Sequence, residues 1–269
     1  MKIGNKIFEP SEKTYVMGIL NVTPDSFSDG GSYTSIDKAM EQTEKMIQQG
    51  ADIIDVGGES TRPGHVQIGD EEEIKRVVPV IREIKKKFDI PVSIDTYKSA
   101  VAKAALEAGA DLLNDIWGFR YDEKMAELAA EYDVPVCLMH NRDNLDYDDF
   151  MEDVKKDLQI SLDIAEKYGV KKENIMLDPG VGFGKTYEQN LMVMNHLEEI
   201  VDMGYPVLLG TSRKSVIGLT LDLPADQRVE GTIATSVIGA MKGCSFFRVH
   251  DVKENLRAIR MTRAILGME

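Results

Sequence analysis

The feature that most constrains the fold is a regular alternation of short β-rich runs with longer helical patterns. Eight runs have the apolar composition typical of strands buried on both faces. They cover residues 15–22, 52–58, 91–96, 111–118, 135–140, 174–179, 206–212 and 246–251. Helical patterns cover residues 36–49, 71–88, 98–108, 124–132, 150–168, 187–203, 231–242 and 255–266. This order predicts parallel strands joined by right-handed crossovers.

Eight strand–helix units favour a closed α/β barrel, the (β/α)8 TIM barrel, over an open doubly wound sheet. The chain has 269 residues, close to the roughly 250 that are typical of such a barrel. No linker or shift in composition divides it, so we expect residues 1–269 to form a single domain. Residues 2–9 could form a short N-terminal β-hairpin that plugs the bottom of the barrel.

Charge and cysteine content exclude several classes of function. The formal net charge is −14, which disfavours nucleic acid and anionic membranes as partners because any contact would begin with repulsion. Cys137 and Cys244 have no metal-ligand spacing and are expected to be reduced thiols. No run of about 18 apolar residues exists that could span a membrane. We therefore expect a cytoplasmic protein.

Polar side chains recur where the predicted strands end. In a parallel barrel these ends meet at one rim, where the chemistry is located. The residues are Asn21, Asp95, Asn114, Asp115, His140, Asp178, Ser212, Arg213, Lys214, Arg248 and His250. Helix capping could explain any one of them, but not so many at one rim.

The strand-end residues fall into two chemical sets. Asp95, Asn114 and Asp178 offer acceptors and amide groups that suit the donor-rich edge of an aminopyrimidine ring. Lys214, Arg248, His250 and the turn at 212–215 offer donors that suit phosphate oxygens. A ligand that carries both a heterocycle and a diphosphate would satisfy both sets.

Three segments after strands have the composition of functional loops. Residues 21–31 and 57–65 are long and rich in turn residues, which makes them candidate lids. Residues 178–185 combine glycines, which allow close backbone approach, with the aromatic ring of Phe183.

Taken together, these segments resemble the dihydropteroate synthases, the folate-pathway enzymes that sulfonamides inhibit. The two longest matching motifs are GILNVTPDSFSDGG at 18–31 and DVGGESTRPG at 55–64. Further matches are SIDT at 93–96, ND at 114–115, DPGVGFGK at 178–185, GTSRKS at 210–215 and RVHD at 248–251. They cover nearly the whole chain in order. The segment 140–143, after the fifth strand, fits the family pattern less well.

The resemblance implies a transferase that joins 6-hydroxymethyl-7,8-dihydropterin diphosphate to p-aminobenzoate with the assistance of magnesium (Mg2+). It makes Asn21 the magnesium ligand, and Asp95, Asp178, Lys214 and Arg248 the catalytic residues. The residues implied to bind the pterin diphosphate are Thr61, Asp95, Asn114, Asp178, Lys214, Arg248 and His250. Those implied to shape the p-aminobenzoate site are Phe27, Thr61, Arg62, Pro63, Phe183 and Ser212.

Rival functions and the assembly remain open on the sequence alone. A pterin-binding methyltransferase that uses methyltetrahydrofolate is the nearest alternative, although its substrate carries no diphosphate for Thr61, Arg248 and His250. A non-catalytic pterin-binding or nucleotide-binding module and a sugar-phosphate isomerase or aldolase are more distant. The resemblance also implies a homodimer, formed through helices such as 231–242. The small residues of that helix would equally suit packing within the barrel.

Overall fold

The eight predicted strands form one parallel sheet that curls into a barrel. The computed structural model describes residues 1–23, 32–59 and 67–268. The strands are β3 (Tyr15–Asn21), β4 (Ile53–Gly57), β5 (Val92–Asp95), β6 (Leu112–Asp115), β7 (Val136–Met139), β8 (Ile175–Asp178), β9 (Leu208–Leu209) and β10 (Phe246–Val249). Strands β3 to β8 pair in order, and β10 pairs with both β3 and β9. A parallel bridge between Leu177 and Val207 closes the barrel, so the predicted TIM barrel is confirmed.

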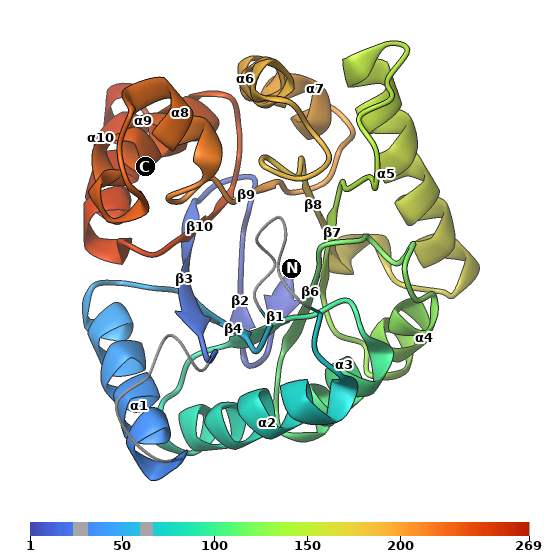
Figure 1. Ribbon diagram of the computed structural model, residues 1–269, viewed down its shortest axis with the longest axis vertical. Helices are drawn as coiled ribbons and strands as arrows, with labels where there is room; N and C mark the ends of the chain where they lie inside the picture. Colours follow the sequence, from blue (N-terminus) through green and yellow to red (C-terminus); the bar gives the residue numbers. More distant parts are fainter. Residues whose placement is uncertain (24–31, 60–66, 269) are drawn as a thin grey trace.

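Helices surround the barrel and connect successive strands (Figure 1). They are α1 (Ser32–Gln48), α2 (Asp70–Lys87), α3 (Ser99–Glu107), α4 (Lys124–Glu131), α5 (Phe150–Lys167), α6 (Tyr187–Asn195), α7 (Leu197–Val201), α8 (Ser215–Leu221), α9 (Val229–Met241) and α10 (Val252–Ile265). Short 3-10 turns cover Lys172–Asn174 and Ala225–Gln227. Within the described residues, no helix is long and apolar enough to cross a bilayer.

Two details of the helix prediction are wrong. The pattern at 187–203 predicted one helix, but His196 has non-helical dihedrals (φ −120°, ψ 28°) and separates α6 from α7. This break lets α7 bury Leu197 and Ile200 fully. Helix α8 was not predicted, because its seven residues are too few to show an apolar period of 3.6.

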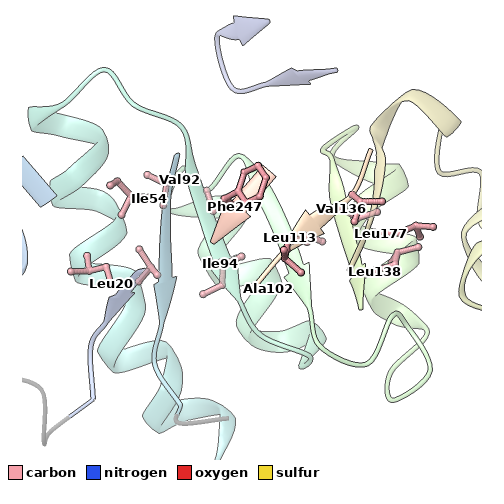
Figure 2. Packing of buried hydrophobic residues seen from close by; sticks show 14 of the residues in the cluster. Leu20, Ile54, Val92, Ile94, Ala102, Leu113, Val136, Leu138, Leu177 and Phe247 are labelled. Atoms are coloured by element: carbon pink, nitrogen blue, oxygen red, sulfur yellow. The ribbon is translucent and has the colours of Figure 1, made fainter. Parts of the chain in front are cut away.

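Alternation of side chains along each strand divides the apolar core into two parts. Outward-facing residues such as Ile54, Val92 and Leu177 pack under the helices (Figure 2). Inward-facing residues fill the lower barrel: Met17, Ile53, Leu112, Cys137, Met176, Leu208 and Phe246. Each fully buried side chain of this size contributes about 1.5–3 kcal/mol relative to exposure.

The predicted N-terminal hairpin is confirmed and closes the lower end of the barrel. Strands β1 (Lys2–Ile3) and β2 (Lys6–Ile7) pair antiparallel. Ile3 and the neighbouring Phe8 are buried in the same cluster as the inward-facing apolar residues. Figure 1 shows the hairpin lying across the barrel axis. The opposite end, where the strands terminate, is therefore left for polar groups.

Candidate active site at the carboxyl ends of the strands

The two-residue period of the strands decides which polar side chains point into the barrel. On four strands, the residue two positions beyond the inward apolar layer is polar. The apolar residue and the polar residue two positions later are Ile53 and Asp55 on β4, Leu112 and Asn114 on β6, Met176 and Asp178 on β8, and Phe246 and Arg248 on β10. On β5, Asp95 lies beside Asn114 in the pairing register. One layer of the barrel thus collects three carboxylates, one amide and one guanidinium.

Arg248 connects the carboxylates of two other strands. Its Nε donates to Asp55 Oδ2 at 2.6 Å, and its Nη2 donates to Asp95 Oδ2 at 2.6 Å. Asp55 is fully buried, and its Oδ2 also accepts from Asn114 Nδ2 at 3.3 Å. The remaining oxygens, Asp55 Oδ1 and Asp95 Oδ1, are buried without a hydrogen-bond partner among the described residues. Because an unmatched buried carboxylate oxygen is costly, this layer calls for a ligand that carries N–H donors.

Burial and the ion pairs together set the pKa values of this layer. Burial raises the pKa of Asp95 to about 7, although Arg248 opposes the shift and Asp55 adds to it. Burial alone would lower the pKa of Arg248, but Asp55 and Asp95 hold it above its ordinary value. The guanidinium therefore remains charged, while Asp95 can change protonation near neutral pH.

A second group lies on the β8 side of the barrel. Asp178 Oδ1 accepts from the backbone N–H of Gly180 at 2.7 Å. Lys214 Nζ donates to the carbonyl of Val181 at 2.5 Å and lies 4.7 Å from the centre of the Phe183 ring. Burial lowers the pKa of Lys214 to about 8, and Asp178 opposes this shift. A carboxylate, an ammonium group and an aromatic ring thus meet at the start of one loop.

Two further predicted residues lie at the ends of β9 and β10. Ser212 Oγ is 2.9 Å from His250 Nδ1 and also accepts from the backbone N–H of His250 at 3.1 Å. Arg213, beside Ser212, pairs with Asp251 through two nitrogen–oxygen contacts of 3.1 and 2.6 Å. These contacts hold the turn after β9 against the end of β10.

Asn21 faces the carboxylate of Asp95 across a glycine. A Cβ atom built on Gly57, which lies between them in the pairing register, would be 3.7 Å from Asn21 Oδ1 and 3.7 Å from Asp95 Oδ2. Any larger side chain at position 57 would fill the space between the two oxygens. Mg²⁺ prefers oxygen ligands and commonly binds through one or two protein groups plus substrate phosphates. The donor set around Asn21 fits that mode of binding.

In the part of the chain that the structure describes, no three acidic, His or Cys side chains form a set that could hold a metal ion by themselves.

The structure brings together the predicted residues Asn21, Asp95, Asn114, Asp178, Phe183, Ser212, Lys214, Arg248 and His250 at the carboxyl ends of the strands. The predictions for Phe27, Thr61, Arg62 and Pro63 lie outside the described residues. Sequence reasoning missed Asp55, the second carboxylate partner of Arg248. A charged residue inside a completely buried strand was the signal that could have identified it.

Comparisons with known proteins agree with this geometry. Residues 17–250 match the model of a family described as pterin binding enzyme. The chain is 64% identical over 267 residues to a dihydropteroate synthase of Clostridium beijerinckii, covering 99% of both chains. Among solved structures, it resembles the Clostridium difficile dihydropteroate synthase crystallised with pteroic acid. That match has 55% identity and a TM-score of 0.94, and covers 96% of this chain and 99% of that one.

A Xanthomonas albilineans dihydropteroate synthase with 4-aminobenzoic acid is also similar. It has 40% identity and a TM-score of 0.91, with 96% of this chain and 94% of that one covered. These matches cover nearly the whole chain. The chain therefore belongs to the pterin-binding enzyme family, among the dihydropteroate synthases.

Proposed function

We propose that this chain joins p-aminobenzoate to 6-hydroxymethyl-7,8-dihydropterin diphosphate and releases diphosphate. The observation that carries the proposal is the buried layer of Asp55, Asp95 and Arg248, in which two carboxylate oxygens have no donor among the residues that the structure describes. The amino and ring N–H groups of a pterin supply such donors. Similar enzymes were crystallised with pteroic acid and with 4-aminobenzoic acid, the product-like and amine ligands that this reaction requires.

In the proposed reaction, the bond between the pterin methylene carbon and the diphosphate oxygen breaks. The amine nitrogen of p-aminobenzoate forms a new bond to that carbon and loses a proton. Positive charge spreads over the pterin as the leaving group departs, and Asp95 and Asp178 stabilise this charge electrostatically. The amine is a weak base that is already unprotonated near neutral pH, so the step does not depend on a strong general base.

Binding of the diphosphate falls to the cationic side of the site. Arg248 has five N–H donors, and its contacts with Asp55 and Asp95 occupy one on Nε and one on Nη2. The others would bind phosphate oxygens, together with His250 and with Thr61, whose role is implied by the family resemblance. Lys214 and Asn114 hold the pterin beside Asp95 and Asp178. Asn21 would hold magnesium, which when bound offsets negative charge that grows on the leaving diphosphate.

The p-aminobenzoate pocket is proposed to lie between two strand ends. Phe183 after β8 and Ser212 after β9 form its described sides. Phe27, Thr61, Arg62 and Pro63, from the loops after β3 and β4, would complete it.

Diphosphate release measured with and without p-aminobenzoate, in magnesium buffer, tests the proposal. We expect release to depend on the amine and dihydropteroate to form. Asp95→Asn should lower the rate by at least about 10²-fold, the loss typical of removing one preorganised electrostatic contact. Asp133→Asn, which changes an exposed carboxylate at the far end of the barrel, is the matched control. Binding of methyltetrahydrofolate without diphosphate release would favour the methyltransferase instead.

We also propose a homodimer that forms through the outer face of α9 and α10. The small residues of α9 serve packing within the chain: a Cβ on Gly231 would lie 2.3 Å from Ile217, and one on Gly239 would lie 2.5 Å from Leu209. The exposed apolar residues of these two adjacent helices are Ile238, Met241, Met261 and Ile265. Exposed apolar side chains gathered on neighbouring helices are typical of a protein interface.

Two further proposals concern the whole chain. The hairpin and the closed barrel share one apolar cluster, which supports a single domain over residues 1–269. Cys137 and Cys244 are buried free thiols, and this supports the expected cytoplasmic, reducing location.

A further inference from the structure

A buried network of polar and charged side chains lies behind the loop between β8 and α6, and none of the proposed substrate contacts involves it. His140 follows β7 and is 1% exposed, and its Nε2 lies 3.0 Å from Asp157 Oδ2 on α5. Arg142 Nε donates to the same oxygen at 2.6 Å, and Arg120 Nη1 lies 3.6 Å from Asp157 Oδ1. His140 and Arg142 belong to the segment 140–143, which fits the sequence pattern of the dihydropteroate synthases less well than the other motifs do.

Lys185, at the end of the loop, joins this network from the other side. Its Nζ lies 2.7 Å from His140 Nδ1 and donates to the carbonyls of Gly180 and Phe183 at 3.0 Å each. An ammonium group has three N–H donors, so these three acceptors match the charged form of Lys185 completely. Burial lowers the pKa of Lys185 to about 7, and Asp178 opposes the shift. The arrangement assigns a neutral ring to His140, with its proton on Nε2 facing Asp157. Burial lowers the pKa of His140 to about 4, although Asp157 opposes the shift, and this agrees with a neutral ring at pH 7.

The loop backbone is pressed against the segment after β7. Gly180 has a φ of +67°, and a Cβ atom at this position would lie 1.9 Å from the carbonyl oxygen of His140. Close to the other end of the loop, the hydroxyl of Tyr147 donates to the carbonyl of Gly184 at 2.7 Å. The loop is thus held at both ends by residues that follow β7.

The opposite side of the same loop contacts the candidate active site. The carbonyl of Val181 accepts from Lys214 Nζ, and the ring of Phe183 lies beneath that ammonium group. A change in the backbone at Gly180 or Phe183 would therefore move both the aromatic ring and the acceptor of Lys214.

We propose that Lys185 and His140 are positioning residues that hold the loop between β8 and α6, so that Phe183 faces the p-aminobenzoate end of the site. The inference rests on the proposed function, in which Phe183 shapes the amine pocket. Asp157 acts through His140 by fixing the orientation of its ring. Asp95 and Asn114, on strands away from the loop, would keep their hold on the pterin if the loop moved, whereas Lys214 would lose its acceptor at Val181.

The test replaces Lys185 with methionine, which preserves most of the side-chain length and removes the donors. Misplacement of a binding group by about 1 Å can cost on the order of 10²-fold in rate. We expect Lys185→Met to raise the KM for p-aminobenzoate at least about tenfold, and the KM for the pterin diphosphate by a clearly smaller factor. Lys171→Met, which removes an exposed ammonium paired with Asp133 at the other end of the barrel, should change neither constant.

Hydrogen exchange of the amides at 180–184 provides a readout that needs no substrate. Exchange should be faster in Lys185→Met than in the wild type, and unchanged in Lys171→Met. An unchanged KM for p-aminobenzoate in an active Lys185→Met enzyme would overturn the inference, as would equal rises in both KM values. An inactive wild type would instead refute the proposed function, and hydrogen exchange would still report on the loop.

A pair of substitutions at His140 covers the case in which Lys185→Met does not fold. His140→Asn places an amide oxygen close to the position of Nδ1 and keeps an acceptor for Lys185, whereas His140→Ala removes it. We expect the KM for p-aminobenzoate to rise at least about tenfold in His140→Ala and clearly less in His140→Asn. Equal values in the two variants would contradict the proposed contact between His140 and Lys185.

Discussion

Replacing Arg248 with methionine tests the strength of the buried ion pairs around it. Asp55 is fully buried and Asp95 is 8% exposed, and each carboxylate lies 2.6 Å from a guanidinium nitrogen. Methionine keeps much of the side-chain volume but leaves both carboxylates without their cation. Removing one partner of a buried pair costs about 3–5 kcal/mol. We expect the free energy of unfolding at pH 8 to fall by that amount.

The loss of stability in Arg248→Met should depend on pH. Burial already raises the pKa of Asp95 to about 7 with Arg248 opposing the shift, so removing Arg248 raises it further. The folded state then holds a proton that an unfolded Asp, with a pKa of about 3.9, releases. The free energy of unfolding therefore falls as pH rises from about 4 to the raised pKa. The decrease in the free energy of unfolding caused by Arg248→Met should therefore be smaller at about pH 5.5 than at pH 8.

Urea unfolding followed by the fluorescence of Trp117, the only tryptophan, measures both effects. The series comprises the wild type, Arg248→Met, Asp55→Asn and the double variant, with Arg82→Met on the exposed face of α2 as control. The double variant should lose less than the sum of the single losses, because each substitution removes the other's partner. The reasoning would be refuted if Arg248→Met lowered the free energy of unfolding at pH 8 by less than about 1 kcal/mol, if this decrease did not depend on pH, and if the effects of the two single substitutions were additive.

The pterin site and two other regions can be tested in the same way. Burial raises the pKa of Asp95 to about 7, so protonation removes its carboxylate acceptor as pH falls. Calorimetry should therefore show that the affinity for the pterin weakens from pH 8 to pH 6. The affinity of Asp95→Asn should change much less. Gly180→Ala would place Cβ 1.9 Å from the His140 carbonyl at a positive φ; urea titration should show a loss of at least about 1–3 kcal/mol. Light scattering should detect monomers for Ile265→Asp. The control Ile160→Asp, which changes an exposed side chain of α5, should remain a dimer.

Local sequence determined the barrel and much of its inward-facing layer. The alternation of strands and helices predicted parallel pairing, because a strand followed by a helix returns to the same sheet through a crossover. The two-residue period of each strand then decided that Asn114, Asp178 and Arg248 would point inward with Leu112, Met176 and Phe246. Neither step requires information from distant parts of the chain. The roles of these residues and the predictions at Phe27, Thr61, Arg62 and Pro63 stay predictions.

Only the tertiary structure decided which polar groups meet. Asp55 and Arg248 are 193 residues apart in sequence, and His140 and Lys185 are 45 apart. No periodic pattern relates such positions, because their distance depends on how the sheet curls and where β9 and β10 close it. The same closure buries Asp95 and Lys214 and moves their pKa values toward neutrality. Sequence thus predicts which face a side chain occupies, whereas its partner and its protonation depend on the closed barrel.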